Sequence, residues 1–134
     1  MKLGYPPNLI ELKICEVVPP SLPTAGDVLL EVTAVIGAFS GVGSCWINAK
    51  EMESFSNATH LLYSSLQGIA QLASISPEDF TFSLEPSDSS GSVLVKIKIV
   101  NYHPVLCSLS GEFIVELQAL AQVVAWSKNP YLDP

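Results

Sequence analysis

The stretch from Asn48 to Gly68 constrains the fold most strongly, because its helical period and its end signals agree. The Asn48 side chain is expected to cap the first turn, and Glu51, three residues on, to reach back to the Asn48 amide as in a capping box. Gly68 supplies a left-handed residue that ends a helix. The residues that form a stripe at helical spacing are Met52, Phe55, Ala58, Thr59, Leu62 and Leu66. One face of this helix must therefore be buried, and neighbouring strands are the expected cover.

Two-residue alternation predicts three strands before this helix, at residues 8–18, 28–35 and 42–47. The first is expected to be an outer strand. The Pro-rich stretch 19–23 and a glycine-rich turn at 37–41 separate them. Trp46 is expected to pack at the corner between the last strand and the helix.

Four further strands are predicted after the helix, at residues 69–75, 80–86, 92–100 and 105–110. The turn-rich residues 86–91 predict a hairpin, across which Lys96 or Lys98 would lie near Glu85. Gly111 is expected to end the last strand. A second amphipathic helix is then expected from Glu112 to about Ser127, with its apolar face formed by Phe113, Leu117, Leu120, Ala121 and Val124.

This order of elements predicts an α+β fold: a mainly antiparallel sheet of about six to seven strands with two amphipathic helices packed on one face. A chain of 134 residues with 49% hydrophobic content predicts a single domain over residues 1–134, with a Pro-rich connection at 19–23. The sequence shows no evident internal repeat.

The charge balance narrows the class of partner. The chain has thirteen carboxylates against six basic residues, all of them lysine, and a net charge of -7. Without arginine for bidentate phosphate contacts, it fits neither nucleic acid nor an anionic membrane surface, whereas a basic protein such as a toxin fits well. An acidic surface that only keeps the protein in solution would explain the same composition. The carboxylates expected to bind a partner are Glu51, Glu53, Glu78, Asp79, Glu85 and Asp88.

The residues that usually carry chemistry form no recognisable site. His60 lies on the polar side of the predicted helix and His103 precedes a proline, and neither has a metal-ligand partner at the right spacing. There is no Gly-x-Ser-x-Gly motif and no phosphate-binding loop. We therefore predict no catalytic residue, no cofactor and no metal, and a protein that is not an enzyme.

The three cysteines and the chain start bear on location. Cys15, Cys45 and Cys107 are widely spaced beside apolar runs, which favours buried free thiols in a reducing compartment. The first residues lack the apolar core of a signal peptide, and no run approaches the ~20 apolar residues of a membrane span. A cytoplasmic location is expected.

The order of landmarks resembles one known family. The landmarks are Gly37-Ala38-Phe39-Ser40-Gly41, the helix with Met52 and Phe55, Leu66-Gln67-Gly68-Ile69-Ala70-Gln71-Leu72, Phe82-Ser83-Leu84, Gly91-Ser92-Val93-Leu94-Val95 and a closing helix from Phe113. From Val28 to Ser127 this resembles the WapI-type bacterial immunity proteins, which are small α+β proteins. The resemblance implies a cytoplasmic protein that binds and neutralises a partner toxin, one that acts on nucleic acid, and it carries over no catalytic residues.

Two other functions fit the same sequence. A self-associating structural or adaptor protein would pair strand edges or apolar side chains between subunits, giving a homo-oligomer. A small enzyme or a carrier of an apolar ligand would need a concave pocket, for which Phe80, Phe82 and Trp46 are the candidate lining residues.

Overall fold

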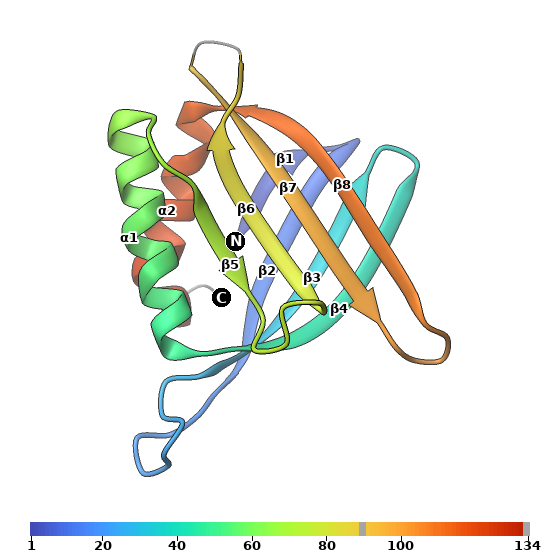
Figure 1. The fold of residues 1–134 in the computed structure, drawn as a ribbon, viewed down its shortest axis with the longest axis vertical. Helices are drawn as coiled ribbons and strands as arrows, with labels where there is room; N and C mark the ends of the chain where they lie inside the picture. Colours follow the sequence, from blue (N-terminus) through green and yellow to red (C-terminus); the bar gives the residue numbers. More distant parts are fainter. Residues whose placement is uncertain (89–90, 133–134) are drawn as a thin grey trace.

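The computed structural model describes residues 1–88 and 91–132, which form two four-stranded antiparallel sheets and two helices (Figure 1). The strands of the first sheet are β1 (Lys2–Tyr5), β2 (Asn8–Val17), β3 (Val28–Ile36) and β4 (Phe39–Ile47). The strands of the second sheet are β5 (Ala70–Ala73), β6 (Phe80–Pro86), β7 (Ser92–Asn101) and β8 (Cys107–Glu116). The predicted α+β class and antiparallel pairing are confirmed. The prediction of one sheet with fewer strands is wrong.

The chain repeats one structural unit. In each sheet every strand pairs with the next one along the chain, and a helix follows the fourth strand. Helix α1 (Ala49–Ser65) follows β4, and α2 (Leu120–Lys128) follows β8 after a short 3-10 turn (Leu117–Ala119). A second 3-10 turn (Pro130–Leu132) follows α2. The sequence did not reveal this repeat, because the two halves share an order of elements rather than a pattern of residues.

The two sheets face each other, and the helices close one side. Strand β4 contacts β7 and β8, while α1 packs on α2 and on β5, and α2 reaches β1. Figure 1 shows both helices on the side of the molecule away from β4 and β8, and the strands of the two sheets crossing. Apolar side chains from both sheets fill the space between them. The prediction that both helices pack on one face of a single sheet is therefore wrong. Each half contributes one helix, and the two helices lie together on one side of the molecule.

Helix α1 forms largely as predicted. The Asn48 side chain accepts a hydrogen bond from the Glu51 amide at 2.8 Å, and Phe55 of its buried stripe lies 5.9 Å from the ring of Phe82. Two details differ. The Glu51 carboxylate binds the Ala73 amide of β5 at 3.1 Å rather than the Asn48 amide, and Leu66 takes the left-handed conformation before Gly68 is reached. No helix within the described residues is long and apolar enough to span a membrane.

Two glycines allow the sheets to approach closely. A Cβ atom on Gly43 of β4 would lie 2.5 Å from Cγ2 of Ile99 in β7, and one on Gly111 of β8 would lie 2.8 Å from Cγ2 of Ile36 in β3. Neither space holds a methyl group without movement of its neighbour. Gly111 lies inside β8 and pairs with Ile97 of β7, so the prediction that it ends the last strand is wrong.

The strand boundaries carry further corrections. Strand β1 was not predicted, and because it pairs with β2, β2 is an interior strand paired on both sides and not the outer strand that was predicted. The last strand continues through β8 to Glu116, and the helix predicted from Glu112 begins only at Leu120. The Pro-rich residues 19–23 lie in the connection between β2 and β3. The predicted hairpin between β6 and β7 forms, although residues 89–90 of its loop lie outside the described part of the chain.

Candidate functional site

The two sheets have four edge strands, and two of these edges are covered by helices. An edge strand presents unpaired backbone N–H and C=O groups, which is where another chain can pair. At β5, helix α1 packs alongside, and the Glu51 carboxylate accepts the Ala73 N–H. At β1, which has only four residues, α2 lies against the strand.

The edge of β4 is bridged to the second sheet at two points. The Val42 carbonyl accepts a hydrogen bond from Nδ2 of Asn101 at 3.0 Å, and the Trp46 carbonyl accepts one from the Ile75 amide at 2.9 Å. Both carbonyls point away from β3, because in an antiparallel pair alternate residues direct their backbone groups to the partner strand and to the free edge. Another strand could pair along β4 only if these two hydrogen bonds were broken.

In the part of the chain that the structure describes, no hydrogen bond from another element covers the edge of β8. The Leu117 amide donates a hydrogen bond to the Gly91 carbonyl at 3.0 Å. Together with the register of β7 and β8, this bond shows which residues of β8 direct their backbone groups to β7. The residues whose backbone groups point away from β7 are Ser108, Ser110, Glu112, Ile114 and Glu116. Within residues 1–88 and 91–132, no hydrogen bond is made to the outward backbone groups of these five residues. We call this row the open edge of β8.

Two hollows lie along the open edge. The larger, of about 540 Å³, is lined by residues 113–116 of β8 and by Gly4 and Tyr5 of β1, Pro7 of the β1–β2 turn and Asn8 of β2. The smaller, of about 230 Å³, lies between residues 107–109 of β8 and residues 40–42 of β4. The larger hollow is also lined by Ala119 and Gln122, which follow β8, and the smaller one by Ile99 and Asn101 of β7. We call the larger one the β8 groove.

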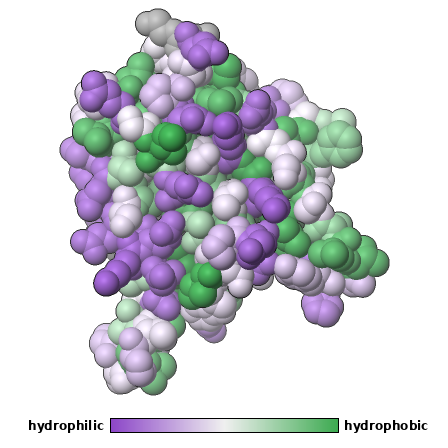
Figure 2. Space-filling model, in the orientation of Figure 1, coloured by the Kyte–Doolittle hydropathy of each residue, from purple (hydrophilic) through white to green (hydrophobic). Residues whose placement is uncertain are grey.

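Exposed apolar side chains border this side of the molecule. Tyr5 at the β8 groove is 81% exposed, Phe39 at the β3–β4 turn 75% and Ile114 on β8 57%. Val105 and Leu106, in the loop before β8, are also largely exposed. Figure 2 shows apolar surface over the β3–β4 turn and over the β7–β8 loop. Exposed apolar groups that gather around one edge are typical of a protein-binding surface.

The charges beside the open edge are those of two glutamates on β8 and two lysines on β7, of which Lys98 lies in register with Ser110. Glu112 and Glu116 lie on β8 itself, and in register with Glu112 lies Lys96 of β7. Lys96 also forms an ion pair with Glu85 at 2.8 Å, as the sequence predicted for this hairpin. The hydrogen bond and the charge of Glu85, with a further contribution from Glu112, raise the pKa of Lys96. One lysine therefore lies between two carboxylates, and Glu116 has no basic residue opposite it in the register.

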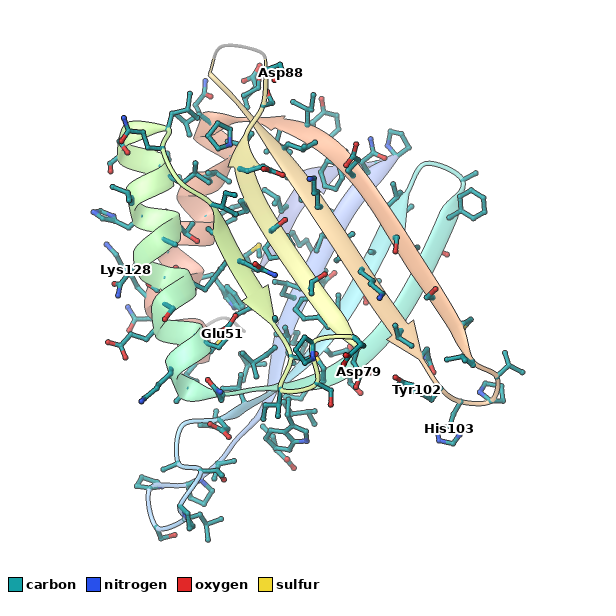
Figure 3. The ribbon with its side chains drawn as sticks, viewed as in Figure 1. Glu51, Asp79, Asp88, Tyr102, His103 and Lys128 are labelled. Carbon is teal, nitrogen blue, oxygen red and sulfur yellow. The ribbon has the colours of Figure 1, made fainter. Side chains whose placement is uncertain are left out.

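The six carboxylates predicted to bind a partner do not form one surface. Glu51 binds a backbone amide, Glu85 pairs with Lys96, and Asp79 accepts a hydrogen bond from the Tyr102 hydroxyl. That hydrogen bond raises the pKa of Tyr102. Figure 3 shows Asp79 beside Tyr102 at one end of the molecule and Asp88 at the other.

Glu53 and Glu78 are the remaining two of these carboxylates. Both are exposed, on α1 and in the β5–β6 loop respectively.

Sequence reasoning missed Glu112, Ile114 and Glu116, because it placed them in a helix. The sign that could have found them is the two-residue alternation that continues through Gly111. The side chains of residues 109, 111, 113 and 115 point towards the core, and those of Ser108, Ser110, Glu112 and Glu116 point to the outer face of the sheet. The apolar Ile114 on the outward side weakens this alternation.

The cysteines and Trp46 differ from their predicted places. Cys45 on β4 is buried, and burial, with the nearby charge of Asp79, raises the pKa of its thiol to about 12. Cys15 and Cys107 are exposed, so the prediction that they are buried is wrong. Trp46 lies on the outer side of β4 and is 38% exposed, rather than packed within the corner. With its raised pKa, the Cys45 thiol is a poor nucleophile near neutral pH.

The pocket suggested by Phe80, Phe82 and Trp46 is not formed. The two phenylalanines are packed in the core, whereas Trp46 faces outward. Among the described residues, no group of three or more His, Cys, Asp and Glu side chains is arranged to hold a metal ion. His60 and His103 are both exposed.

Comparisons of this chain with known protein families, with curated proteins and with solved structures find no match.

Proposed function

We propose that this protein is a non-catalytic protein-binding module that holds a basic partner against the open edge of β8. In this role it acts in the cytoplasm as an immunity protein that neutralises a cognate toxin, as the resemblance to WapI-type proteins implies. One observation carries the proposal. Of the four sheet edges, β4 and β5 are hydrogen-bonded to other parts of the chain and β1 packs on α2, whereas β8 combines backbone groups that no described residue bonds, an apolar border and two carboxylates.

The charge of the chain supports a basic partner. A nuclease must present a basic surface to its substrate, and a protein with a net charge of -7 and no arginine is attracted to such a surface. Covering that surface excludes the substrate without any chemistry on the part of the inhibitor. A nuclease toxin is therefore the kind of partner that suits this chain.

Mixing the purified protein with the toxin domain encoded beside its gene tests this function. We expect a stoichiometric complex, loss of nuclease activity and weaker binding at high salt, because the attraction is partly electrostatic. Co-expression should restore growth to cells that produce the toxin domain. An unbound and fully active toxin domain would contradict the proposal, as would a gene neighbourhood that encodes no toxin and a protein that binds no nuclease.

A matched pair of charge reversals locates the surface. The double variant Glu112→Lys/Glu116→Lys changes the open edge, and Glu53→Lys/Asp88→Lys makes the same change in net charge on α1 and in the β6–β7 loop. We expect the first variant to lose most of its affinity and the second to lose only the small, salt-sensitive part that net charge provides. Equal loss in both variants would show that overall charge, and no particular surface, binds the partner.

Self-association is the second candidate, because an open edge can also pair with a copy of itself. It predicts a dimer at all concentrations in light scattering, and a monomer would exclude it. Two features act against it. Both copies carry a net charge of -7, and an antiparallel pair centred on Ile114 would place Glu112 opposite Glu116 of the other copy.

A further inference from the structure

The backbone of β8 offers a ready partner for another strand. Its outward residues alternate with those bonded to β7, so about every 7 Å along the edge an N–H and a C=O point into solvent together. Such a pair exchanges two hydrogen bonds with one residue of an added antiparallel strand. The whole second sheet is antiparallel, and continuing it adds a strand in the same sense.

The β8 groove provides the space that an added strand needs. A neighbouring strand lies about 4.8 Å away in the plane of the sheet. Beside residues 113–116, the hollow of about 540 Å³ lies between β8 and Tyr5 of β1 and Pro7 of the β1–β2 turn. An extended segment in this position would contact β8 through its backbone and Tyr5 through its inward side chains.

The side chains of β8 define what the segment should contain. On the outer face, Glu112 and Glu116 lie on either side of Ile114, and side chains directly opposite one another across two strands interact most strongly. Lysine or arginine suits the positions opposite the two glutamates, and a β-branched residue suits the position opposite Ile114. On the inner face, Phe113 and Val115 favour apolar side chains.

We infer that the open edge of β8 binds an extended segment of a basic partner protein by strand addition, with a basic residue opposite Glu112 and another opposite Glu116. This inference rests on the proposed function, because it states how the module holds its partner. The complementary charge argues for a basic partner over a second copy of this chain, in which carboxylates would lie opposite one another in the pairing described above.

A synthetic peptide tests the pairing directly. The probe is a nine-residue peptide that alternates valine with lysine, threonine, lysine and threonine, so that the lysines can lie opposite Glu116 and Glu112 and the last threonine opposite Ser110. We expect saturable binding by fluorescence anisotropy, and a loss of about tenfold or more when both lysines are replaced by glutamate. Absence of saturable binding into the millimolar range would overturn the inference.

N-methylation of the peptide separates backbone pairing from charge attraction. Methyl groups on the amides of lysine and threonine remove the donors that point to β8, and methyl groups on the valine amides remove those that point away. The first peptide should lose binding by about tenfold or more, and the second should bind as the parent does. Equal binding by the two methylated peptides would overturn strand addition.

A proline pair on the protein gives the matching test. Ser110→Pro removes an outward N–H of β8, which leaves the hydrogen bonds to β7 in place because proline is tolerated where an edge N–H faces solvent. Ser44→Pro makes the same change at an outward position of β4. We expect Ser110→Pro to abolish peptide binding and Ser44→Pro to preserve it, with thermal unfolding to confirm that both variants fold.

The same variants distinguish failure of the inference from failure of the proposed function. If Ser110→Pro still binds and inhibits the toxin domain as the wild type does, strand addition is wrong and the inhibitor function stands. If the wild-type protein binds the alternating peptide but no toxin domain, strand addition stands and the inhibitor function is wrong. A wild-type dimer that Ser110→Pro converts to a monomer would assign the edge to a second copy and overturn the inference.

Discussion

Strands β4 and β8 are each the fourth strand of their half and lie at the edge of their sheet, but different features limit the pairing of another strand with each of them. Strand β4 (Phe39–Ile47) has no charged residue and no proline, and its edge is bridged by Asn101 and Ile75 from the other half. Within residues 1–88 and 91–132 no hydrogen bond bridges the edge of β8 to the other half, and the strand carries two glutamates instead. Covering an edge removes it from use, whereas charging it only restricts which strands can pair there. The comparison indicates that the open edge of β8 accepts only strands whose charge suits its two glutamates.

The thiols of the two strands give the largest expected difference. In a Cys15→Ser background, Cys107 of β8 should react with Ellman's reagent at pH 8 as an exposed thiol does. Cys45 of β4 should react on the order of a thousandfold more slowly, because burial raises its pKa to about 12 and leaves little thiolate. Comparable rates for the two thiols would show that β4 opens readily and would weaken the comparison.

The raised pKa of Cys45 also predicts a dependence of stability on pH. The folded state holds the thiol proton more tightly than the unfolded chain, so this contribution to stability is full below about pH 9. It is lost as pH rises from there towards 12. Between pH 9 and 11 the free energy of unfolding should therefore fall more steeply in the wild type than in Cys45→Ala. Parallel curves from chemical denaturation would contradict this.

A methyl group on β4 tests how tightly the two halves are joined. Gly43→Ala should lower the free energy of unfolding by about 1–3 kcal/mol, because the new Cβ would lie 2.5 Å from Cγ2 of Ile99. Gly41→Ala is the matched control on the same strand, where the nearest atom is 3.5 Å away. Gly41→Ala should lower the free energy of unfolding only slightly, and urea denaturation measures this free energy for both variants. Equal stability of the two variants would mean that the sheets separate easily at β4.

Removing one bridge should make the two edges more alike. Asn101→Ala deletes the hydrogen bond to the Val42 carbonyl, together with the local one that Oδ1 of Asn101 accepts from the His103 amide, and the loss of the bridge is expected to cost about 0.5–1.5 kcal/mol. Asn57→Ala, at an exposed site on α1, is the control and should cost nothing by comparison. If Asn101→Ala also costs nothing in thermal unfolding, the bridge does not protect the edge of β4.

The sequence predicted those elements whose own residues determine them. Helix α1 follows from its cap and its stripe, and β6 and β7 follow from unbroken alternation of buried and exposed residues. The sequence could not show that Gly111 serves the contact with Ile36 of the other sheet, so a strand was ended there. Leu117 and Leu120 then continued a helical spacing from Phe113 by coincidence.

The candidate site was missed for a related reason. Whether an edge is open depends on what the rest of the chain places beside it, and neither the bridge from Asn101 to Val42 nor the cap of Glu51 on Ala73 follows from any local pattern. The sequence shows the charge of each carboxylate but not the group that it contacts in the fold. Three of the carboxylates predicted to bind a partner proved to be engaged within the molecule, by a backbone amide, by Lys96 and by Tyr102.

Residue-resolved amide hydrogen exchange tests the open edge of β8 most directly. In the free protein, the amides of Ser110, Glu112 and Ile114 should exchange fast, whereas those of Gly111 and Phe113, which face β7, should be protected. With saturating alternating peptide, the three fast amides should slow by about tenfold or more, and the amides of β4 should not change. If the amides of Ser110, Glu112 and Ile114 are already protected in the free protein, or stay fast while the peptide protects β4, the open edge of β8 is not the binding surface.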